Sequence, residues 1–168
     1  MEANELKKIL ELHAKWLNGE KGGERANLSD ADLSYVDLSG VDLRHSILKG
    51  TILRGADLRG ATLSDVDLEG ADLKYTILSS VDLEGADLRH ANLKGADLDY
   101  SCLPLWCGSL SANFDDRQLK QIAYHLVKAG LQSENASEEA KTELRKLIPF
   151  ANGFHRAEEC GLIDEDDE

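Results

Sequence analysis

The chain has 168 residues, of which 30% are charged and 42% hydrophobic, and its formal net charge at pH 7 is -13. No apolar run approaches the roughly 20 residues that a helix needs to cross a bilayer, and the acidic balance disfavours direct contact with nucleic-acid phosphates. Residues 1–4 are too polar to begin a secretory signal, and three cysteines are too few for a disulfide framework. We therefore expect a cytoplasmic protein with no membrane segment and no direct nucleic-acid binding.

The first predicted element is an amphipathic helix over residues 5–18. Its apolar residues recur at the i, i+3, i+4 spacing that places them on one face. The sequence Glu-Lys-Gly-Gly-Glu at 20–24 then breaks the helix. The apolar stripe comprises Leu6, Ile9, Leu10, His13, Trp16 and Leu17, which makes His13 a core residue rather than a catalyst.

Sixteen leucines occupy every fifth position from Leu28 to Leu103. On an α-helix, residues five apart lie about 140° from each other, so these leucines would spread around the whole surface. On a strand, an odd period sends successive leucines to opposite faces. All of them share one core only if the chain turns a corner in each unit, which predicts a coiled solenoid over 26–105.

The other positions of the five-residue unit are typical of a chain that turns at each repeat. Two residues before the leucine, Ala occurs in eight units and suits a second inward-facing row. Directly before the leucine, Asp occurs in nine units, and its carboxylate can bond nearby turn amides. Two residues after the leucine, Gly recurs seven times, which favours a turn with positive φ.

This pattern, seen in Ala31-Asp32-Leu33, resembles the pentapeptide-repeat family. The resemblance implies a right-handed, four-sided β-helix with one pentapeptide per side, and hence about four coils. The spacing alone leaves three or four sides open. We therefore expect a mainly β fold, with a buried leucine column that includes Leu33, Leu38, Leu58, Leu78 and Leu98.

The repeat ends near residue 105, and helical patterns follow it. Asp and Ser are frequent first residues of helices, whereas Gly and Pro often end them. The predicted helices are 115–129, beginning at Asp115 or Asp116 and ending at Gly130; 137–148, beginning near Ser137 and ending at Pro149; and a short one near 150–160.

Both flanks are predicted to cap the solenoid, because an open coil exposes leucines and unpaired strand edges at its ends. The organisation is then an N-terminal capping helix and linker (1–25), the β-helix (26–105) and a C-terminal helical cap with an acidic tail (106–168). The C-terminal segment is too short for a robust core of its own. We expect it to pack on the last coil or on a second copy in a homodimer.

The sequence has no nucleophile motif, phosphate loop or metalloprotease motif, so we expect no enzyme activity and no cofactor. The conceivable metal set comprises Cys102, Cys107, His155 and Cys160, but their spacings differ from those of common zinc sites. We expect cysteines buried in the cap rather than metal ligands.

Stacking the repeat in steps of 20 residues, as a square cross-section requires, predicts which outward side chains meet. One side gathers bases after the leucine, and another gathers acids before it. Two isoleucines on neighbouring sides are either isolated exposed residues or a small contact patch. The candidate interaction surface comprises the bases Arg54, Lys74 and Lys94, the acids Asp37, Asp57 and Asp97, and the isoleucines Ile47 and Ile52.

Two functions fit such a surface. The first is a non-catalytic interaction or scaffold module that binds another protein. The second, implied by the family resemblance, is a DNA-mimicking modulator of DNA gyrase like the quinolone-resistance pentapeptide proteins. The first is favoured, because four coils rise only about 19 Å at strand spacing. One chain would imitate about five or six base pairs, and the basic column interrupts the acidic surface that mimicry requires.

Overall fold

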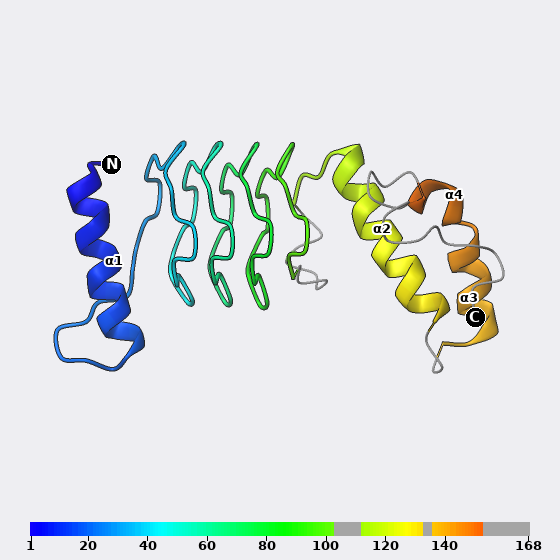
Figure 1. Cartoon of the computed structure of the whole chain (residues 1–168), viewed down its shortest axis with the longest axis horizontal. Helices are drawn as coiled ribbons and strands as arrows, with labels where there is room; N and C mark the ends of the chain where they lie inside the picture. The colour runs from blue at the N-terminus through cyan, green and yellow to red at the C-terminus, as the bar shows by residue number, and fades with distance from the viewer. Residues whose placement is uncertain (103–111, 133–135, 153–168) are drawn as a thin grey trace. The chain divides into compact units, whose positions relative to one another are not determined.

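The computed structural model describes residues 1–102, 112–132 and 136–152, and the chain divides into two units, Met1–Asn113 and Phe114–Glu168. The first unit contains α1 (Ala3–Leu17) and the stacked coils of the repeat, and the described residues of the second contain three helices (Figure 1). These are α2 (Asp116–Leu131), α3 (Glu138–Arg145) and α4 (Ile148–Ala151). Within the described ranges, no helix has the length and apolar character needed to cross a membrane.

Parallel bridges join residues 20 apart throughout the repeat, as between Asp37 and Asp57 and between Asp57 and Ile77. Four pentapeptides therefore make one coil. Two hydrogen bonds form each bridge: the Asp57 N–H donates to the Val36 carbonyl at 2.9 Å, and the Leu38 N–H donates to the Asp57 carbonyl at 2.7 Å. Over the described residues the sides consist of isolated bridges without continuous strands, so the fold is a repeat β-helix whose β content is confined to single bridges.

The leucine column fills the interior of the coils. Leu33, Leu38 and Leu78 are 1% exposed, Leu58 is fully buried, and Leu98 is 2% exposed. The alanines two residues earlier, such as Ala56, form the second inward row. Because each coil presses its leucines against those of its neighbours, burial of this one column supplies most of the hydrophobic stabilisation of the unit.

Every corner of the solenoid has left-handed backbone. At each fifth position from residue 30 to residue 100, φ lies between 55° and 75°. Glycine occupies seven of these corners, as the sequence pattern predicts, but the other eight carry Asp, Tyr, His or Ser. A non-glycine residue in this region costs about 1 kcal/mol or more, so the burial and hydrogen bonds of each coil must offset that strain.

Helix α1 packs against the first coil through one buried face. Leu6 and His13 are its buried residues, and the His13 Nδ1 accepts a hydrogen bond from the Ala26 N–H at 3.1 Å. The Trp16 ring stacks on His13 at a centroid distance of 5.7 Å and meets His45 of the first coil edge-on at 6.3 Å. His13 is therefore a core residue that satisfies a backbone donor where the solenoid begins.

The second unit begins with a reciprocal cap. The Asp115 carboxylate accepts from the Gln118 N–H at 3.0 Å, and the Gln118 side chain accepts from the Asp115 N–H at 2.9 Å. Asp115 rather than Asp116 is thus the residue that precedes α2. The predicted end at Gly130 is wrong, because α2 continues to Leu131, whose side chain is 1% exposed. Burying a leucine contributes more than the roughly 1 kcal/mol that an interior glycine costs.

The end of the second predicted helix also differs from expectation. Ser137 begins α3 as predicted, since its hydroxyl accepts from the Ala140 N–H at 3.2 Å. However, α3 ends at Arg145, and Pro149 lies in the first turn of α4. A proline is well suited to that position because the first turn needs no N–H donor. Of the third predicted helix, 150–160, only the first residues belong to α4, and residues from 153 onward lie outside the described ranges.

A small hydrophobic cluster joins α2 and α4, and Leu144 of α3 packs against it. Tyr124 and Val127 of α2 pack with residues of α4, and all are nearly fully buried. The cluster comprises Tyr124, Val127, Leu131, Ile148 and Ala151.

We expect Leu58→Ala to lower the free energy of unfolding by about 2–5 kcal/mol, because it leaves a cavity in the leucine column. Chemical denaturation measures the change. Leu119→Ala makes the same substitution at a position that is 43% exposed, and should cost less than about 0.5 kcal/mol. Asp57→Asn should also be mild. Equal losses for Leu58→Ala and Leu119→Ala would contradict the inward placement of the column.

Acidification should weaken the attachment of α1. Burial lowers the pKa of His13 below its usual 6.5, and nearby Arg25 and His45 act in the same direction against Asp42, which raises it. The unfolded chain therefore binds this proton more readily than the folded one. The stabilisation is present above about pH 6.5 and decreases as the pH falls toward the lowered pKa.

Thermal unfolding between pH 7.5 and 5 measures this effect. His13→Asn keeps an oxygen acceptor for the Ala26 N–H but does not titrate, so the melting temperature should depend less on pH in this variant. His90→Asn is the matched control at an exposed corner, and it should leave the pH profile of the parent unchanged. Parallel profiles for the parent and His13→Asn would contradict the assignment.

Candidate functional site

The outward side chains form one face on each side of the solenoid, and we name two of them. The basic face comprises 32–34, 52–54, 72–74 and 92–94. The acidic face comprises 37–39, 57–59, 77–79 and 97–99. The 20-residue register of the bridges stacks the members of each face directly above one another.

The basic face carries three bases against two acids, and an ion pair joins part of the column. The Arg54 guanidinium lies 2.6 Å from an oxygen of Asp72, and the Lys74 ammonium lies 4.0 Å from the same oxygen. No ion pair involves Lys94 in the part of the chain that the structure describes. The structure thus brings Arg54, Lys74 and Lys94 to one side, but Asp72 neutralises part of their charge.

Two exposed tyrosines stand at the corner beside the basic face. Tyr35 is 83% exposed and Tyr75 is 65% exposed. Each ring lies over the glycine of the next coil, because a Cβ added at Gly55 would lie 2.7 Å from the Tyr35 ring, and one at Gly95 would lie 2.5 Å from the Tyr75 ring. These glycines therefore supply space for the rings as well as positive φ.

The tyrosines were not among the residues that we selected from the sequence. The signal is present, since positions 35, 55, 75 and 95 read Tyr, Gly, Tyr, Gly once the register of 20 is applied. Glycine is expected at every corner, and a bulky ring at a left-handed position is uncommon. An aromatic residue at such a corner is therefore a candidate surface feature.

The two predicted isoleucines lie on different sides. Ile52 is 36% exposed and stands on the basic face, where it and Arg54 flank Leu53. Ile47 is half-buried on the neighbouring side, bridged to Asn27 and Asp67. Ile52 therefore adds an apolar contact to the basic face and its tyrosine corner, whereas Ile47 contributes to another side.

The three predicted acids stack in one column of the acidic face, but Ile77 interrupts it between Asp57 and Asp97. The Arg59 side chain donates to the Asp57 carboxylate at 2.9 Å and lowers the pKa of that carboxyl. The Ser39 hydroxyl similarly lowers the pKa of Asp37. Both acids stay ionised at neutral pH, yet Arg59 cancels the charge of Asp57.

The acids before the leucines also have a structural role. The Asp57 carboxylate accepts from the N–H of Arg59, two residues further along the chain, at 3.1 Å. This side-chain to backbone bond closes a turn. Asn27 and Asn92 make the same bond with their amide oxygens, at 3.1 and 3.2 Å. The acid can therefore be replaced by asparagine without loss of the turn.

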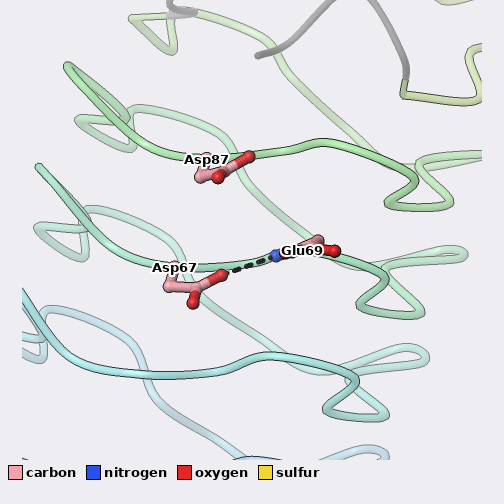
Figure 2. Close-up of side chains that lie close together, drawn as sticks. All are labelled: Asp67, Glu69 and Asp87. Carbon is pink, nitrogen blue, oxygen red and sulfur yellow. Dashed lines mark hydrogen bonds between the residues drawn. The ribbon is translucent and has the colours of Figure 1, made fainter.

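A third side carries three carboxylates close enough to suggest a metal site. Figure 2 shows Asp67, Glu69 and Asp87, with the Glu69 N–H donating to Asp67 at 3.0 Å. Lys49 lies 2.9 Å from Glu69, and Arg89 pairs with both Asp87 and Glu69. Lys49 holds the pKa of Glu69 below its usual range. A divalent cation would have to displace two side-chain cations, so this cluster is an ion-pair ladder.

Of the conceivable metal set that its spacings disfavour, Cys107, His155 and Cys160 lie outside the described residues. Cys102 is exposed, so the expectation that it is buried in the cap is wrong. The last described coil leaves it on the outer column with Asp82.

The repeat block matches the family model described as pentapeptide repeats, in eight copies within 26–65, 37–74 and 67–103. The sequence-based recognition is thereby confirmed, and 26–103 is a pentapeptide-repeat region. Solved structures are also similar to this chain. No curated protein matches the sequence.

Rfr23 and HetL are two similar structures, both from cyanobacteria. Rfr23, from Cyanothece 51142, is 32% identical over 55% of this chain and 53% of its own, with a TM-score of 0.36. HetL, from Nostoc sp. strain PCC 7120 and described as involved in regulating heterocyst differentiation, is 35% identical over 46% of this chain and 42% of its own, with a TM-score of 0.23. The chain thus spans about half, or less, of the length of these two proteins.

A third similar structure is a trypsin-treated form of QnrB1, a plasmid-mediated fluoroquinolone resistance protein. It is 23% identical over 65% of this chain and 73% of its own, with a TM-score of 0.23. Likeness at this level carries no argument about function.

Proposed function

We propose that the chain is a non-catalytic protein-interaction or scaffold module of the cytoplasm, and that the basic face with its tyrosine corner binds the partner protein. The observation that carries this proposal is the pair of tyrosine rings, which are mostly exposed and yet held against Gly55 and Gly95. Tyr and Arg are enriched where proteins bind each other. A tyrosine ring offers a large contact area and has few rotatable bonds to order on binding.

We also propose that helices close both ends of the four-coil solenoid. For the N-terminal end, the contacts of α1 with Ala26 and His45 support a capping role. On the C-terminal helices, large apolar residues are exposed, and in a homodimer they would pack against a second copy of the chain. These residues are Leu119, Leu126, Leu147 and Phe150.

Removing the corner rings should abolish partner capture. We expect the double variant Tyr35→Ser, Tyr75→Ser to retain less than about a tenth of the protein captured by the parent, as loss of two interface anchors predicts. The fold should survive, because Ser80 already occupies an equivalent corner with φ of 59°. Affinity capture with quantitative mass spectrometry makes the comparison.

Tyr100→Ser is the matched control, since it removes an exposed ring from a different corner. A partner retained by this control and lost by the double variant supports the proposed surface. Equal capture by all three proteins would show that the tyrosine corner is not the binding surface.

The acidic face favours a second candidate, a DNA-mimicking modulator of DNA gyrase. Asp37, Asp57 and Asp97 stack in one column, as a decoy for a DNA-binding protein would require. Against this, Ile77 interrupts the column and Arg59 pairs with Asp57. The basic face also adds positive charge on the adjoining side.

A gyrase supercoiling assay with micromolar protein tests the second candidate, and we expect no inhibition. The triple variant with Asn at 37, 57 and 97 is the control, because asparagine preserves the turn bond, as at Asn27. Inhibition by the parent that is lost in the triple variant and weakens with salt would establish mimicry. Inhibition that persists in the triple variant would have another cause.

A further inference from the structure

The first coil of the solenoid has no coil before it, and this leaves part of its backbone open. In the later coils, the residue before each leucine directs both its N–H and its carbonyl to the preceding coil. Ile47 is an example: its N–H donates to the Ala26 carbonyl at 3.0 Å, and its carbonyl accepts from the Leu28 N–H at 2.8 Å. The equivalent N–H and carbonyl of Asp37 have no partner among the hydrogen bonds of the described residues.

The N-terminal segment satisfies only part of this edge. The Met1 ammonium group donates to the Asp32 carbonyl at 3.2 Å. His13 accepts from the Ala26 N–H at 3.1 Å, but the equivalent N–H of a later coil closes a turn within that coil, as Ser46 does to Leu43. Among the hydrogen bonds of the described residues, the edge is therefore covered at the Asp32 carbonyl and open at Asn27, Asp37 and Asp42.

A largely apolar groove of about 580 Å³ borders this open position, between α1 and the first coil. Leu10 and Ala14 line it from α1, and Val36 and Leu38 line it from the coil beside Asp37. The volume lies within the range of ordinary ligand pockets. The groove thus combines an apolar floor with one free N–H and one free carbonyl, which is what an edge strand offers to an added strand.

The charge beside Asp37 favours a basic residue at the open ladder position. Asp37 and Glu11 both line the groove, and Lys7 and the Met1 ammonium group supply two opposing charges. Asp57 of the next coil stands directly above Asp37 and adds a further acid, although Arg59 is paired with it. The groove as a whole therefore carries no excess charge, and a cation at the open ladder position would meet the carboxylate of Asp37 itself.

We propose that this groove binds an extended segment of a partner protein, in which a basic residue stands between a small and a larger aliphatic residue. The segment continues the established ladder of Asp37, Asp57, Ile77 and Asp97 by one parallel bridge. The inference rests on the proposed interaction role and deepens it, since it names a second surface and the chemistry of what binds there.

The bridge of the next coil defines the geometry. The Asp57 N–H donates to the Val36 carbonyl, and the Leu38 N–H donates to the Asp57 carbonyl. By the same pattern, the Asp37 N–H donates to the carbonyl of the small residue, and the N–H of the aliphatic residue donates to the Asp37 carbonyl. The two apolar side chains then enter the groove, and the basic side chain stays outside beside the Asp37 carboxylate.

The test uses the whole protein and the synthetic peptide acetyl-Gly-Ala-Lys-Leu-Ser-Gly-amide, followed by the backbone amide NMR signals. We expect a saturable shift and slower hydrogen exchange at the Asp37 N–H. Methylating the leucine nitrogen of the peptide removes one donor and should weaken binding about fivefold or more. Glutamate in place of the peptide lysine should also weaken binding, increasingly so at low salt.

Ala14→Phe fills the groove from an exposed helix position and should abolish binding. Lys8→Phe adds the same ring to α1 at a residue that does not line the groove, and it should bind as the parent does. Absence of a saturable shift at Asp37, or equal binding of the methylated peptide, would overturn the proposal. Displacement of the peptide by laurate with no change at the Asp37 N–H would instead identify the groove as an aliphatic-ligand site.

Failure of this test is distinguishable from failure of the interaction role itself. The capture experiment depends on Tyr35 and Tyr75, which do not line the groove. A partner lost with those tyrosines but unaffected by Ala14→Phe would refute the groove and leave the basic face in place.

Discussion

The left-handed corner at every fifth residue is the constraint on which the rest of the structure depends. An odd repeat cannot place its leucines on one side of a straight element, so each unit must turn before the next leucine. Positive φ at each corner makes that turn possible, and it costs about 1 kcal/mol or more wherever the residue is not glycine. The interior leucines and the bonds between coils offset this cost. The corner and the core are therefore stable only together.

The same constraint determines what the surface can do. Because the interior takes the leucine and the small residue, function is left to the two outward positions and the corner. Those positions stack at strand spacing, about 4.8 Å from coil to coil, so each side chain meets the one a coil away. Lys49, Glu69 and Arg89 show the result, as each cation pairs with the acid next to it. The acidic charge of the repeat is thus partly neutralised within the protein, and many of its carboxylates serve to close turns.

The strict period explains why the solenoid could be predicted from the sequence and the helix ends could not. Leu58 repeats a pattern in which every unit has the same neighbours, so local sequence and final environment agree. Gly130 has no such repetition. Its usual effect on a helix was overridden by Leu131, whose burial with Tyr124 and Ile148 depends on contacts that only the folded unit supplies. Pro149 likewise lies in the first turn of a helix rather than after the end of one, because α3 has already ended at Arg145.

On the candidate surface, the sequence likewise predicted the columns that follow from the 20-residue register but not the contacts between side chains of different columns. Register alone assigned Arg54, Lys74 and Lys94 to one face, because that step needs only the number of residues in a coil. It did not reveal that Asp72 pairs with Arg54. Arg54 follows its leucine and Asp72 precedes its own, so the two side chains lie in neighbouring columns, whereas the register was applied to one column at a time. The tyrosine rings required the structure for a similar reason, because their orientation comes from the glycine one coil further on.

The ends of the solenoid differ from its middle for a reason that follows from the repeat itself. In each interior coil, the backbone N–H and carbonyl groups of the bridges are hydrogen-bonded to the coil before and the coil after. These groups therefore stay paired whatever side chains the repeat carries. The first coil must leave them open or find other partners, and here the N-terminal ammonium group supplies a partner for the Asp32 carbonyl. A repeat protein of this kind has regular sides that display charge and rings at fixed spacing. Its open first-coil edge instead exposes the N–H and carbonyl of Asp37. These backbone groups can bind an extended segment of another chain, whatever the charge of its side chains.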